Sequence, residues 1–422
     1  MESYRLENIE VIPEKKGFQE FAKVSYPVRY GRFSEIQTPD YTFQFNLNGE
    51  IKFIQGRGQT WPHPGEWLKR TVGNDWLYYS AGSYNGIVDL IGEYYYPCLP
   101  YPSNSLFNSY AIDTATQKDA ICAWGRLRSK LSGLAAGSRS KVLRDCLARI
   151  VRNDSRTLKR RADQYPGLIN GRITVLPPDC RHVDYETIPV IVADGCLYHC
   201  GFCRVKSPSD FLPRSREDIR GQLERLKKFY GRDIHNYNSV FLGLHDALMA
   251  EIGLIEFAAL KAHQLLEFEH SNLKNPCLFM FGSVDSLLVS EESKFRALNR
   301  LPFKTYINLG LESADPETLS VLKKPITGRQ VTDAFTRMID INREFEHLEV
   351  SVNFVVGDGL PAGHLPSLLA LVRNSLDRFY SKGAIYLSPL MGCNAGKEML
   401  GHFYRIKTMS RLPVFIYLIQ RL

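Results

Sequence analysis

The sequence of 422 residues predicts an α/β protein, with a core of alternating strands and helices that follows a smaller N-terminal α+β region. Two observations carry this prediction. From about residue 188, short apolar runs rich in β-branched residues alternate six times with longer segments of helical spacing, the order expected of a parallel sheet. Upstream, residues 41–56 alternate apolar and polar side chains around Asn48-Gly49, which is typical of an antiparallel hairpin. Periodicity alone leaves the core open between a doubly wound sheet and a partial barrel.

The chain divides into four regions by pattern and composition. An N-terminal α+β accessory domain is predicted at 1–120, a basic helical linker region at 121–187, the α/β core at 188–390 and a C-terminal extension at 391–422. In the linker region an apolar stripe that includes Leu143 and Ile150 recurs at helical spacing, so the stripe is expected to contact a core while the arginines face solvent. Residues 411–422 are strongly apolar for a terminus and are expected to dock on the core.

Six strands and their helices are expected in the core. The predicted strands are 188–194, 239–247, 277–285, 304–313, 348–358 and 384–390. These runs are continuously apolar, which indicates that both faces of the sheet are covered. Helical spacing is found at 215–231, behind a serine cap, and over one long segment at 248–268. Asp315-Pro316 is a cap and first-turn signal for a further helix.

The positive charge of the chain is concentrated in one block. The net charge is +8, whereas residues 121–163 hold twelve Lys or Arg and three Asp, a surplus of nine. Clustered cations supply salt-dependent affinity for phosphates, so RNA is a candidate partner of this block, and a solvated helical face is the plainer interpretation. The sequence has no run of 18 apolar residues, so no membrane span is expected. Nine cysteines without an even framework favour a reducing, cytoplasmic location.

The most informative stretch is the cysteine loop, residues 195–203, in which Cys196, Cys200 and Cys203 have the spacing C-x3-C-x2-C. A [4Fe–4S] cube normally takes four cysteines, one for each iron. Three protein ligands leave one iron open to a substrate or cofactor, so the spacing favours a cluster that does chemistry. The alternative is a zinc or structural site, for which His199 is the candidate fourth ligand inside the loop.

The cysteine loop, with the aromatic Phe202 before its third cysteine, resembles the signature of the radical S-adenosylmethionine (SAM) enzymes. The resemblance covers residues 188–390, and Gly310-Leu-Glu-Ser313 is similar to an element of the elongator-type, methylthiotransferase and cofactor-assembly branch. It implies a partial (β/α)6 barrel of the TIM type, a [4Fe–4S] cluster on the three cysteines and SAM chelated by the open iron. Reductive cleavage of SAM would then give a 5′-deoxyadenosyl radical that abstracts hydrogen from an unidentified substrate. In such barrels the site forms at the carboxyl ends of the strands, where the cysteine loop lies.

The same resemblance implies SAM contacts at the ends of other strands. Gly243 and Asp246 follow the second strand, where the family has a Gly-Gly-Glu-type motif that accepts a hydrogen bond from the SAM amino group; here Leu replaces the second Gly. The alternative role of Asp246 is to cap the next helix. Glu312 would lie near the ribose or methionyl part of SAM, and Phe202 would present its backbone to the adenine. The remaining implied contacts are Asn353, Val355 and Gly357 on the fifth strand and Ser388 on the sixth.

Other cysteines leave alternatives open. Cys98, Cys122 and Cys146 could hold a second cluster, although Cys146 falls on the apolar stripe. Cys180 could serve as a fourth ligand, which would favour the competing function of an iron–sulfur or zinc protein that acts as an electron carrier or scaffold without SAM turnover. The partners expected of the enzyme are SAM, an electron donor such as flavodoxin or ferredoxin, and a substrate that is a small molecule or a peptide, or RNA bound through 121–163.

Overall fold

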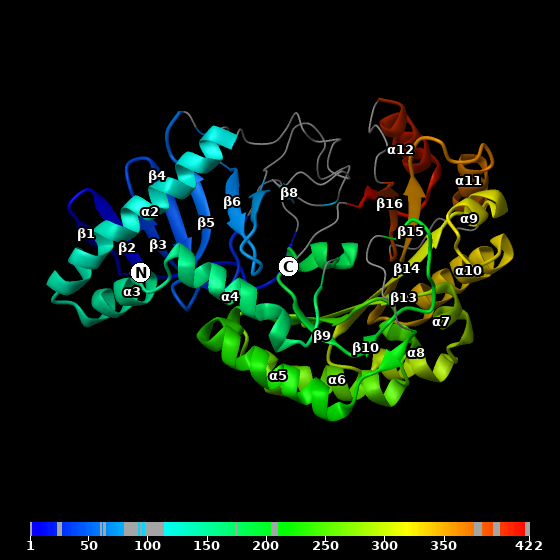
Figure 1. Cartoon of the computed structure of the whole chain (residues 1–422), viewed down its shortest axis with the longest axis horizontal. Coiled ribbons are helices and arrows are strands. Elements are labelled where there is room, and N and C mark those ends of the chain that lie inside the picture. The colour runs from blue at the N-terminus through cyan, green and yellow to red at the C-terminus, as the bar shows by residue number, and fades with distance from the viewer. Residues whose placement is uncertain are drawn as a thin grey trace.

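Two sheets stand side by side along the longest axis of the molecule, an antiparallel one near the N-terminus and a parallel one after it (Figure 1). The computed structural model describes residues 2–22, 28–59, 61, 65–79, 92, 95–97, 114–173, 175–203, 210–374, 382–390 and 397–417. The α/β class expected from the sequence is confirmed by the parallel sheet and its helices.

The N-terminal sheet is an eight-stranded meander in which each strand pairs with the next. Its strands are β1 Tyr4–Leu6, β2 Ile9–Lys16, β3 Arg32–Gln37, β4 Tyr41–Phe45, β5 Ile51–Gly56, β6 Trp67–Arg70, β7 Trp76–Tyr79 and β8 Tyr95–Pro97. The hairpin expected around Asn48-Gly49 is confirmed, because β4 pairs with β5 in antiparallel register. Gly49 has a φ of +79°, a conformation that a residue without a Cβ adopts freely.

Three helices follow this sheet, and two of them cover one of its faces (Figure 1). They are α2 Thr114–Gly137, α3 Lys141–Val151 and α4 Ser155–Leu168. The indole of Trp124 on α2 packs against Phe43 and Phe45 of β4, and the stripe residues Leu143 and Ile150 of α3 are buried. The accessory unit therefore combines the sheet with helices that the sequence analysis assigned to a separate linker region, and the predicted boundary at residue 120 falls inside α2.

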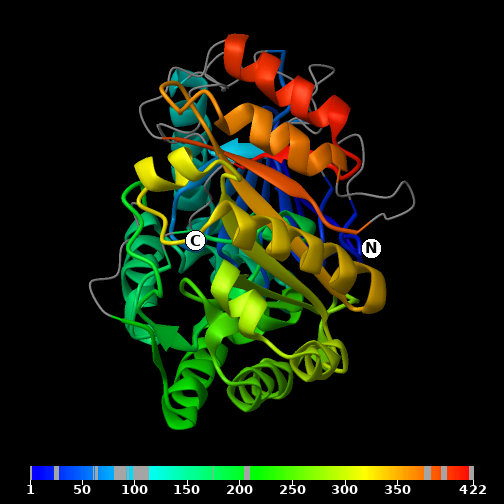
Figure 2. The same ribbon diagram turned by 90° about the vertical axis from the view of Figure 1, so that its right-hand side faces the viewer.

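The core is a seven-stranded parallel sheet in the order β17-β16-β15-β14-β13-β12-β9. Its strands are β9 Ile188–Ile191, β12 Ser239–Gly243, β13 Cys277–Gly282, β14 Lys304–Glu312, β15 Leu348–Val356, β16 Ile385–Pro389 and β17 Val414–Ile416. A doubly wound sheet would reverse its strand order at a switch point. Here the order follows the chain throughout, so the core is a partial barrel with its helices outside (Figure 2). The sequence analysis expected six strands; the seventh, β17, comes from the apolar C-terminal segment and pairs with β16.

The helices of the core mostly follow the predicted boundaries. They are α5 Arg216–Tyr230, α6 Ile252–Leu265, α7 Val284–Val289, α8 Glu292–Asn299, α9 Pro316–Val321, α10 Gly328–Glu344, α11 His364–Asn374 and α12 Lys397–Met409. The caps expected at Ser215 and Asp315 are present, each accepting from a backbone N–H of the first turn. The single helix expected over 248–268 is divided instead into two short 3-10 turns, η5 Ala247–Met249 and η6 Phe268–His270, around α6, because Ala250 is extended and Glu267 has a positive φ.

A further short helix, η3 Pro178–Val183, fills the amino-terminal end of the barrel. The carboxylate of Asp179 accepts hydrogen bonds from Ser351 Oγ (2.5 Å) on β15 and from Tyr386 OH (2.8 Å) on β16, and the ring of His182 stacks on Tyr306 of β14. Since this end is occupied by the chain itself, a site inside the barrel has to be built at the carboxyl ends of the strands. None of the helices in the described ranges has the length and apolar character needed to cross a membrane.

Candidate functional site

The cysteine loop lies at the carboxyl end of the first core strand. It follows β10, Ala193–Asp194, which pairs with β11, Leu212–Pro213, on the far side of the loop. Gly201 N donates to Leu322 O (2.8 Å), just after α9, and Cys203 N donates to Cys200 O (3.3 Å). The loop is therefore attached both to its own base and to the segment after the fourth core strand in sequence, β14.

The three thiols are close enough to influence one another. Cys200 is buried, and Cys196 and Cys203 are half-buried. The pKa of Cys200 is raised to about 11, mainly by burial; Lys324 lowers it, and the charges of Glu312, Cys203 and Cys196 act in the same direction as burial. Burial likewise raises the pKa of Cys196, and the backbone N–H of Tyr198 donates to Cys196 Sγ at 3.4 Å. A bound metal cation favours the thiolate forms of Cys196 and Cys200 against this effect of burial.

A buried ion pair lies beside the cysteine loop. Glu312 is the last residue of β14. The pairing of β14 with β15 shifts register between Gly310 and Glu312, and Glu312 has a φ of +67°, in the left-handed region. Its Oε1 atom is 3.3 Å from Lys324 Nζ, and both side chains are at most 10% exposed. Lys324 Nζ also lies 5.1 Å from the ring centroid of Tyr198, inside the loop. Lys324 is not among the residues predicted from the sequence; the signal for it is the Lys323-Lys-Pro325 run, which begins eleven residues after Glu312.

Asp246 places a buried carboxylate on the other side of the loop. Its Oδ1 accepts from Ser283 N (3.2 Å), after β13, and Oδ2 has no hydrogen-bond partner among the described residues. The side chain makes no capping bond to η5, which it precedes, so the helix-cap alternative is not what the structure shows. Burial raises the pKa of Asp246, and its charge in turn raises that of Cys196. Gly243 ends β12 three residues earlier, and a Cβ there would lie 3.0 Å from Ile173 Cδ1.

The residues expected on the fifth and sixth strands lie at or near the same end. Asn353 is buried and exchanges amide hydrogen bonds with Asn308 of β14 (2.6 and 3.2 Å), while the Val355 carbonyl accepts from His364 Nε2 (2.9 Å). Gly357 and Ser388 are half-buried next to the strand ends, and half-buried Phe202 packs against the core from the loop.

A serine–histidine contact that the sequence analysis did not find joins two of these strands. Ser313 Oγ is 2.8 Å from His364 Nδ1, and both residues are buried. Because Nε2 must carry the proton that it donates to the Val355 carbonyl, Nδ1 accepts from the Ser313 hydroxyl. The contact fixes the residue after Glu312 to the end of β15.

The cysteines outside the loop that the structure describes lie away from it. Cys180 is buried in η3, and its pKa is raised by this burial and then by the charges of Asp179 and of Cys277 at the amino end of β13. Cys180 is therefore at the opposite end of the barrel from the thiols that it would have to join. Cys146 is buried against Ser34 Oγ (3.6 Å), Cys122 is exposed on α2, and Cys98, the third residue considered for a second cluster, lies outside the described residues.

The cysteine loop supplies three thiols, which are the ligands that an iron–sulfur cube takes. Within the ranges described, no three His, Cys, Asp or Glu side chains converge as ligands of one metal ion. A [4Fe–4S] cube has a different requirement, because each iron takes its own cysteine. A negatively charged cluster would be stabilised here by the N–H donor to Cys196 Sγ and by the Lys324 ammonium, next to the three thiols. The unpartnered Oδ2 of Asp246 suits a cationic group of a second ligand.

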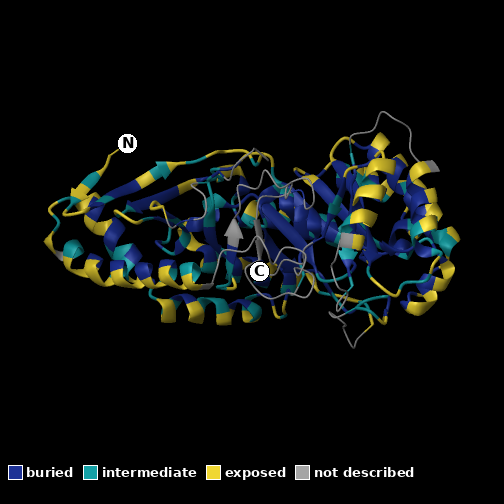
Figure 3. Cartoon of the chain, turned by 90° about the horizontal axis from the view of Figure 1, so that it is seen from above, coloured by how far each residue is buried: buried dark blue, intermediate teal, exposed yellow. Residues whose placement is uncertain are grey.

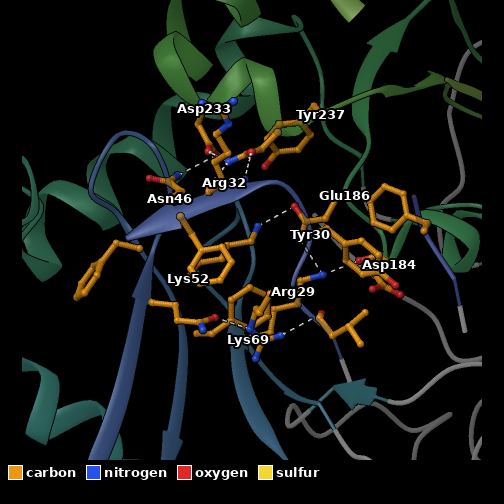
Figure 4. A pocket seen from close by; sticks show the side chains of 17 residues that line it. Arg29, Tyr30, Arg32, Asn46, Lys52, Lys69, Asp184, Glu186, Asp233 and Tyr237 are labelled. Atoms are coloured by element: carbon orange, nitrogen blue, oxygen red, sulfur yellow. Dashed lines mark hydrogen bonds and ion pairs between the residues drawn. The ribbon is translucent and has the colours of Figure 1, made fainter. Parts of the chain in front are cut away.

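A separate cavity of about 60 Å³ lies between the N-terminal sheet and the amino ends of β9 and β12 (Figure 4). Its charged groups pair among themselves: Glu186 accepts from Lys52 Nζ and Lys69 Nζ, both at 2.7 Å, and Asp233 accepts from Asn46 Nδ2 (3.0 Å). Burial opposes ionisation of Glu186, but the two lysines lower its pKa to about 2. This network joins the two parts of the molecule at the end of the barrel away from the cysteine loop.

The buried Asp233 in this network makes the stability depend on pH. Burial raises its pKa to about 7, so the folded state holds this proton more tightly than the unfolded chain. The contribution to stability is complete below about pH 4 and is lost as the pH rises through 7. In Asp233→Asn the fall in the free energy of unfolding between pH 5 and 7 is expected to be smaller by up to about 2 kcal/mol. Urea unfolding at pH 5 and at pH 7 measures this difference in the free energy of unfolding. A variant whose free energy of unfolding falls as much as that of the wild type would contradict the prediction.

Comparison with known proteins agrees with this geometry. Residues 190–372 match the family model of the radical SAM superfamily. No curated protein sequence matches the chain. Among solved structures it is similar to a radical SAM methyltransferase from Sphaerobacter thermophilus, with 16% identity, a TM-score of 0.35, and coverage of 54% of this chain and 64% of that one.

Two further similar structures are the cobalamin-dependent SAM radical enzyme OxsB with aqua-cobalamin bound and methylornithine synthase, PylB. The values for OxsB are 14% identity, TM-score 0.35, and coverage of 55% of this chain and 32% of that one. PylB has 12% identity and a TM-score of 0.36, and the match covers 74% of this chain and 78% of that one. The chain thus spans less than two thirds of the methyltransferase and about a third of OxsB. The matched segment, residues 190–372, is a radical SAM domain, and it carries the three-cysteine loop at the carboxyl edge of a parallel partial barrel; enzymes of this superfamily use a [4Fe–4S] cluster and SAM.

Proposed function

We propose that the chain holds a [4Fe–4S] cluster on Cys196, Cys200 and Cys203 and cleaves SAM reductively to act on a substrate by hydrogen abstraction. The observation that carries the proposal is that the thiols, the Glu312–Lys324 pair and the buried carboxylate of Asp246 meet at one end of the barrel. A cluster held there would supply the one-electron chemistry that cleaves the S–C5′ bond of SAM, and the hydrogen abstraction from the substrate would follow from that cleavage.

In the proposal, different charged side chains bind the cluster and SAM. The Lys324 ammonium offsets the negative charge of the three thiolates, and Glu312, at 3.3 Å, keeps that ammonium in place. Asp246 is held through Oδ1 by Ser283 N, which leaves Oδ2 to accept from the SAM ammonium. A charge-assisted hydrogen bond of this kind is stronger than a neutral one, and stronger still away from water.

The nucleoside side of SAM would lie along the neighbouring strand ends. In the proposal, Phe202 offers its backbone to the adenine, Asn353 and Val355 form the wall, and Gly357 and Ser388 allow close approach. Gly243 lies with Asp246 on the side of the SAM amino group. The support for this arrangement is that the Val355 carbonyl is already taken by His364, so an adenine would meet the apolar side chain instead.

The substrate and electron donor are further parts of the proposal. Flavodoxin or ferredoxin in a reducing cytoplasm would supply the electron. A small molecule or a peptide fits a site inside the barrel, and RNA fits the positive charge of residues 121–163.

Anaerobic reconstitution tests the proposed function. The protein is loaded with iron and sulfide, reduced with dithionite and given SAM, and 5′-deoxyadenosine is measured by chromatography. Formation of this product, together with a change in the electron paramagnetic resonance spectrum on addition of SAM, is expected. A well-formed cluster that releases no 5′-deoxyadenosine and whose spectrum ignores SAM would instead indicate an electron carrier or scaffold.

A further inference from the structure

A strip of exposed cations follows α3 and α4. We call it the basic strip; it consists of Arg139, Lys141, Arg144, Arg152, Arg156, Lys159, Arg160 and Arg172, all exposed. Only two exposed acids, Asp145 and Asp163, lie in the same segment. Among the described residues, Lys159 is the one member of the strip with an ion pair, to Asp163 at 3.4 Å. Figure 3 shows exposed residues along the outer faces of the helices in the N-terminal half of the molecule. The strip therefore carries a surplus of positive charge that the protein does not neutralise.

The strip runs toward the carboxyl end of the barrel. α4 lies antiparallel to α5: Tyr165 OH is 2.7 Å from Tyr230 OH at the end of α5, and Arg225 Nε donates to Leu168 O (2.8 Å). Asn170 Nδ2 then reaches Asp218 Oδ1 (2.7 Å) near the start of α5. The helix α5 begins after the cysteine loop, at the carboxyl end of the barrel, and ends at the amino-terminal end. Because α4 is antiparallel to α5, α4 runs from the amino-terminal end toward the carboxyl end, where the loop lies.

The last member of the strip, Arg172, stands at that edge. A Cβ on Gly171 would collide with Ile191, the last residue of β9, and Ile173 contacts Gly243, the last residue of β12. The preceding backbone is tied to the base of the cysteine loop, because Arg214 donates to Ile169 O (2.9 Å). The same guanidinium pairs with Asp194, two residues before Cys196. One end of the basic strip is thus adjacent to the candidate site.

The chemistry of the strip favours phosphate groups. Six of its eight cations are arginines, whose planar fork binds phosphate through two hydrogen bonds. Helices of 11 and 14 residues are about 16 and 21 Å long, enough to follow several phosphates of one strand. A membrane surface would also require apolar side chains on this face, and among the described residues of the strip the one exposed large hydrophobic side chain is Val142.

We propose that the basic strip binds the phosphate backbone of a single-stranded RNA segment and leads one of its nucleotides to the edge of the barrel. As a statement about the substrate, this rests on the proposed function. An unpaired segment is required because enzymes that react at a base act on it outside the stack.

Fluorescence anisotropy with a labelled 20-nucleotide single-stranded RNA tests the proposal. The triple variant Arg152→Gln, Arg156→Gln, Arg160→Gln is expected to bind at least about tenfold more weakly at 100 mM salt. The slope of log affinity against log salt is expected to decrease by about 2, since each lost phosphate contact removes about 0.7 for a single strand. The matched control removes three exposed arginines from the outer helices of the barrel, Arg300→Gln, Arg329→Gln and Arg343→Gln, and is expected to bind like the wild type.

The outcomes separate this proposal from the proposed function. Equal loss in the control, no loss in the strip variant, or tighter binding of poly-glutamate or of DNA of the same sequence would overturn RNA binding by the strip. Both triple variants are expected to form 5′-deoxyadenosine from SAM at the wild-type rate without RNA, which shows that they are folded. A wild type that binds RNA but never cleaves SAM would overturn the proposed function and leave the binding surface in place.

Discussion

Replacing Cys200 with alanine is expected to remove SAM cleavage, with 5′-deoxyadenosine formation reduced at least about 100-fold, since changes one shell further from a metal already cost 10- to 100-fold. Cys200 is the most buried of the three loop thiols, and Lys324 and Glu312 act on it directly. Among the described residues, the cysteines outside the loop lie on α2, α3, η3 and β13, so none of them stands ready to replace this thiolate. The iron and sulfide content after anaerobic reconstitution is expected to fall together with the product.

Cys122→Ala is the matched control for Cys200→Ala. Cys122 is exposed on α2, in the accessory unit, and the same change of side chain there leaves the loop intact. Wild-type cluster content and turnover are expected of it. Full product formation by Cys200→Ala would contradict the assignment of the loop as the cluster site, and equal loss in both variants would show that the assay reports damage to the fold.

Replacing Asp246 with asparagine is expected to weaken SAM binding by about 10- to 100-fold, the equivalent of one charge-assisted hydrogen bond of 1.5–3 kcal/mol. The amide keeps an oxygen for Ser283 N. It replaces the unpartnered Oδ2, a buried acceptor, by an N–H donor that faces the SAM ammonium. Equilibrium dialysis of SAM against the reconstituted protein, under anaerobic conditions, measures the change.

The control for this prediction is Asp333→Asn, on the exposed face of α10, where the carboxylate pairs only weakly with Arg329 at 3.9 Å. Its SAM affinity is expected to equal that of the wild type. If Asp246→Asn also binds SAM normally while its thermal stability drops, the carboxylate serves only to hold the segment after β13, and the role proposed for it is wrong.

Local patterns in the sequence determined much of this protein. The spacing of Cys196, Cys200 and Cys203 follows from the chain alone, because ligands of one cluster on one loop are neighbours in sequence. The caps at Ser215 and Asp315 and the hairpin at Asn48-Gly49 depend on a few adjacent residues, and the structure has all three. The six predicted strands are likewise present, since an apolar run of that length is a property of one segment.

Only the tertiary structure decided which segments that are distant in sequence come into contact. Lys324 lies beside Tyr198, and α4 packs antiparallel to α5. Both contacts depend on the order and register of the strands, which no local pattern encodes. Periodicity likewise could not show that η3 fills the barrel floor, or that β17 adds a seventh strand, because a short apolar segment fits many partners. The physical reason is that caps and periodicity act over one or two turns, whereas a site at a barrel edge is assembled by sheet pairing across more than a hundred residues.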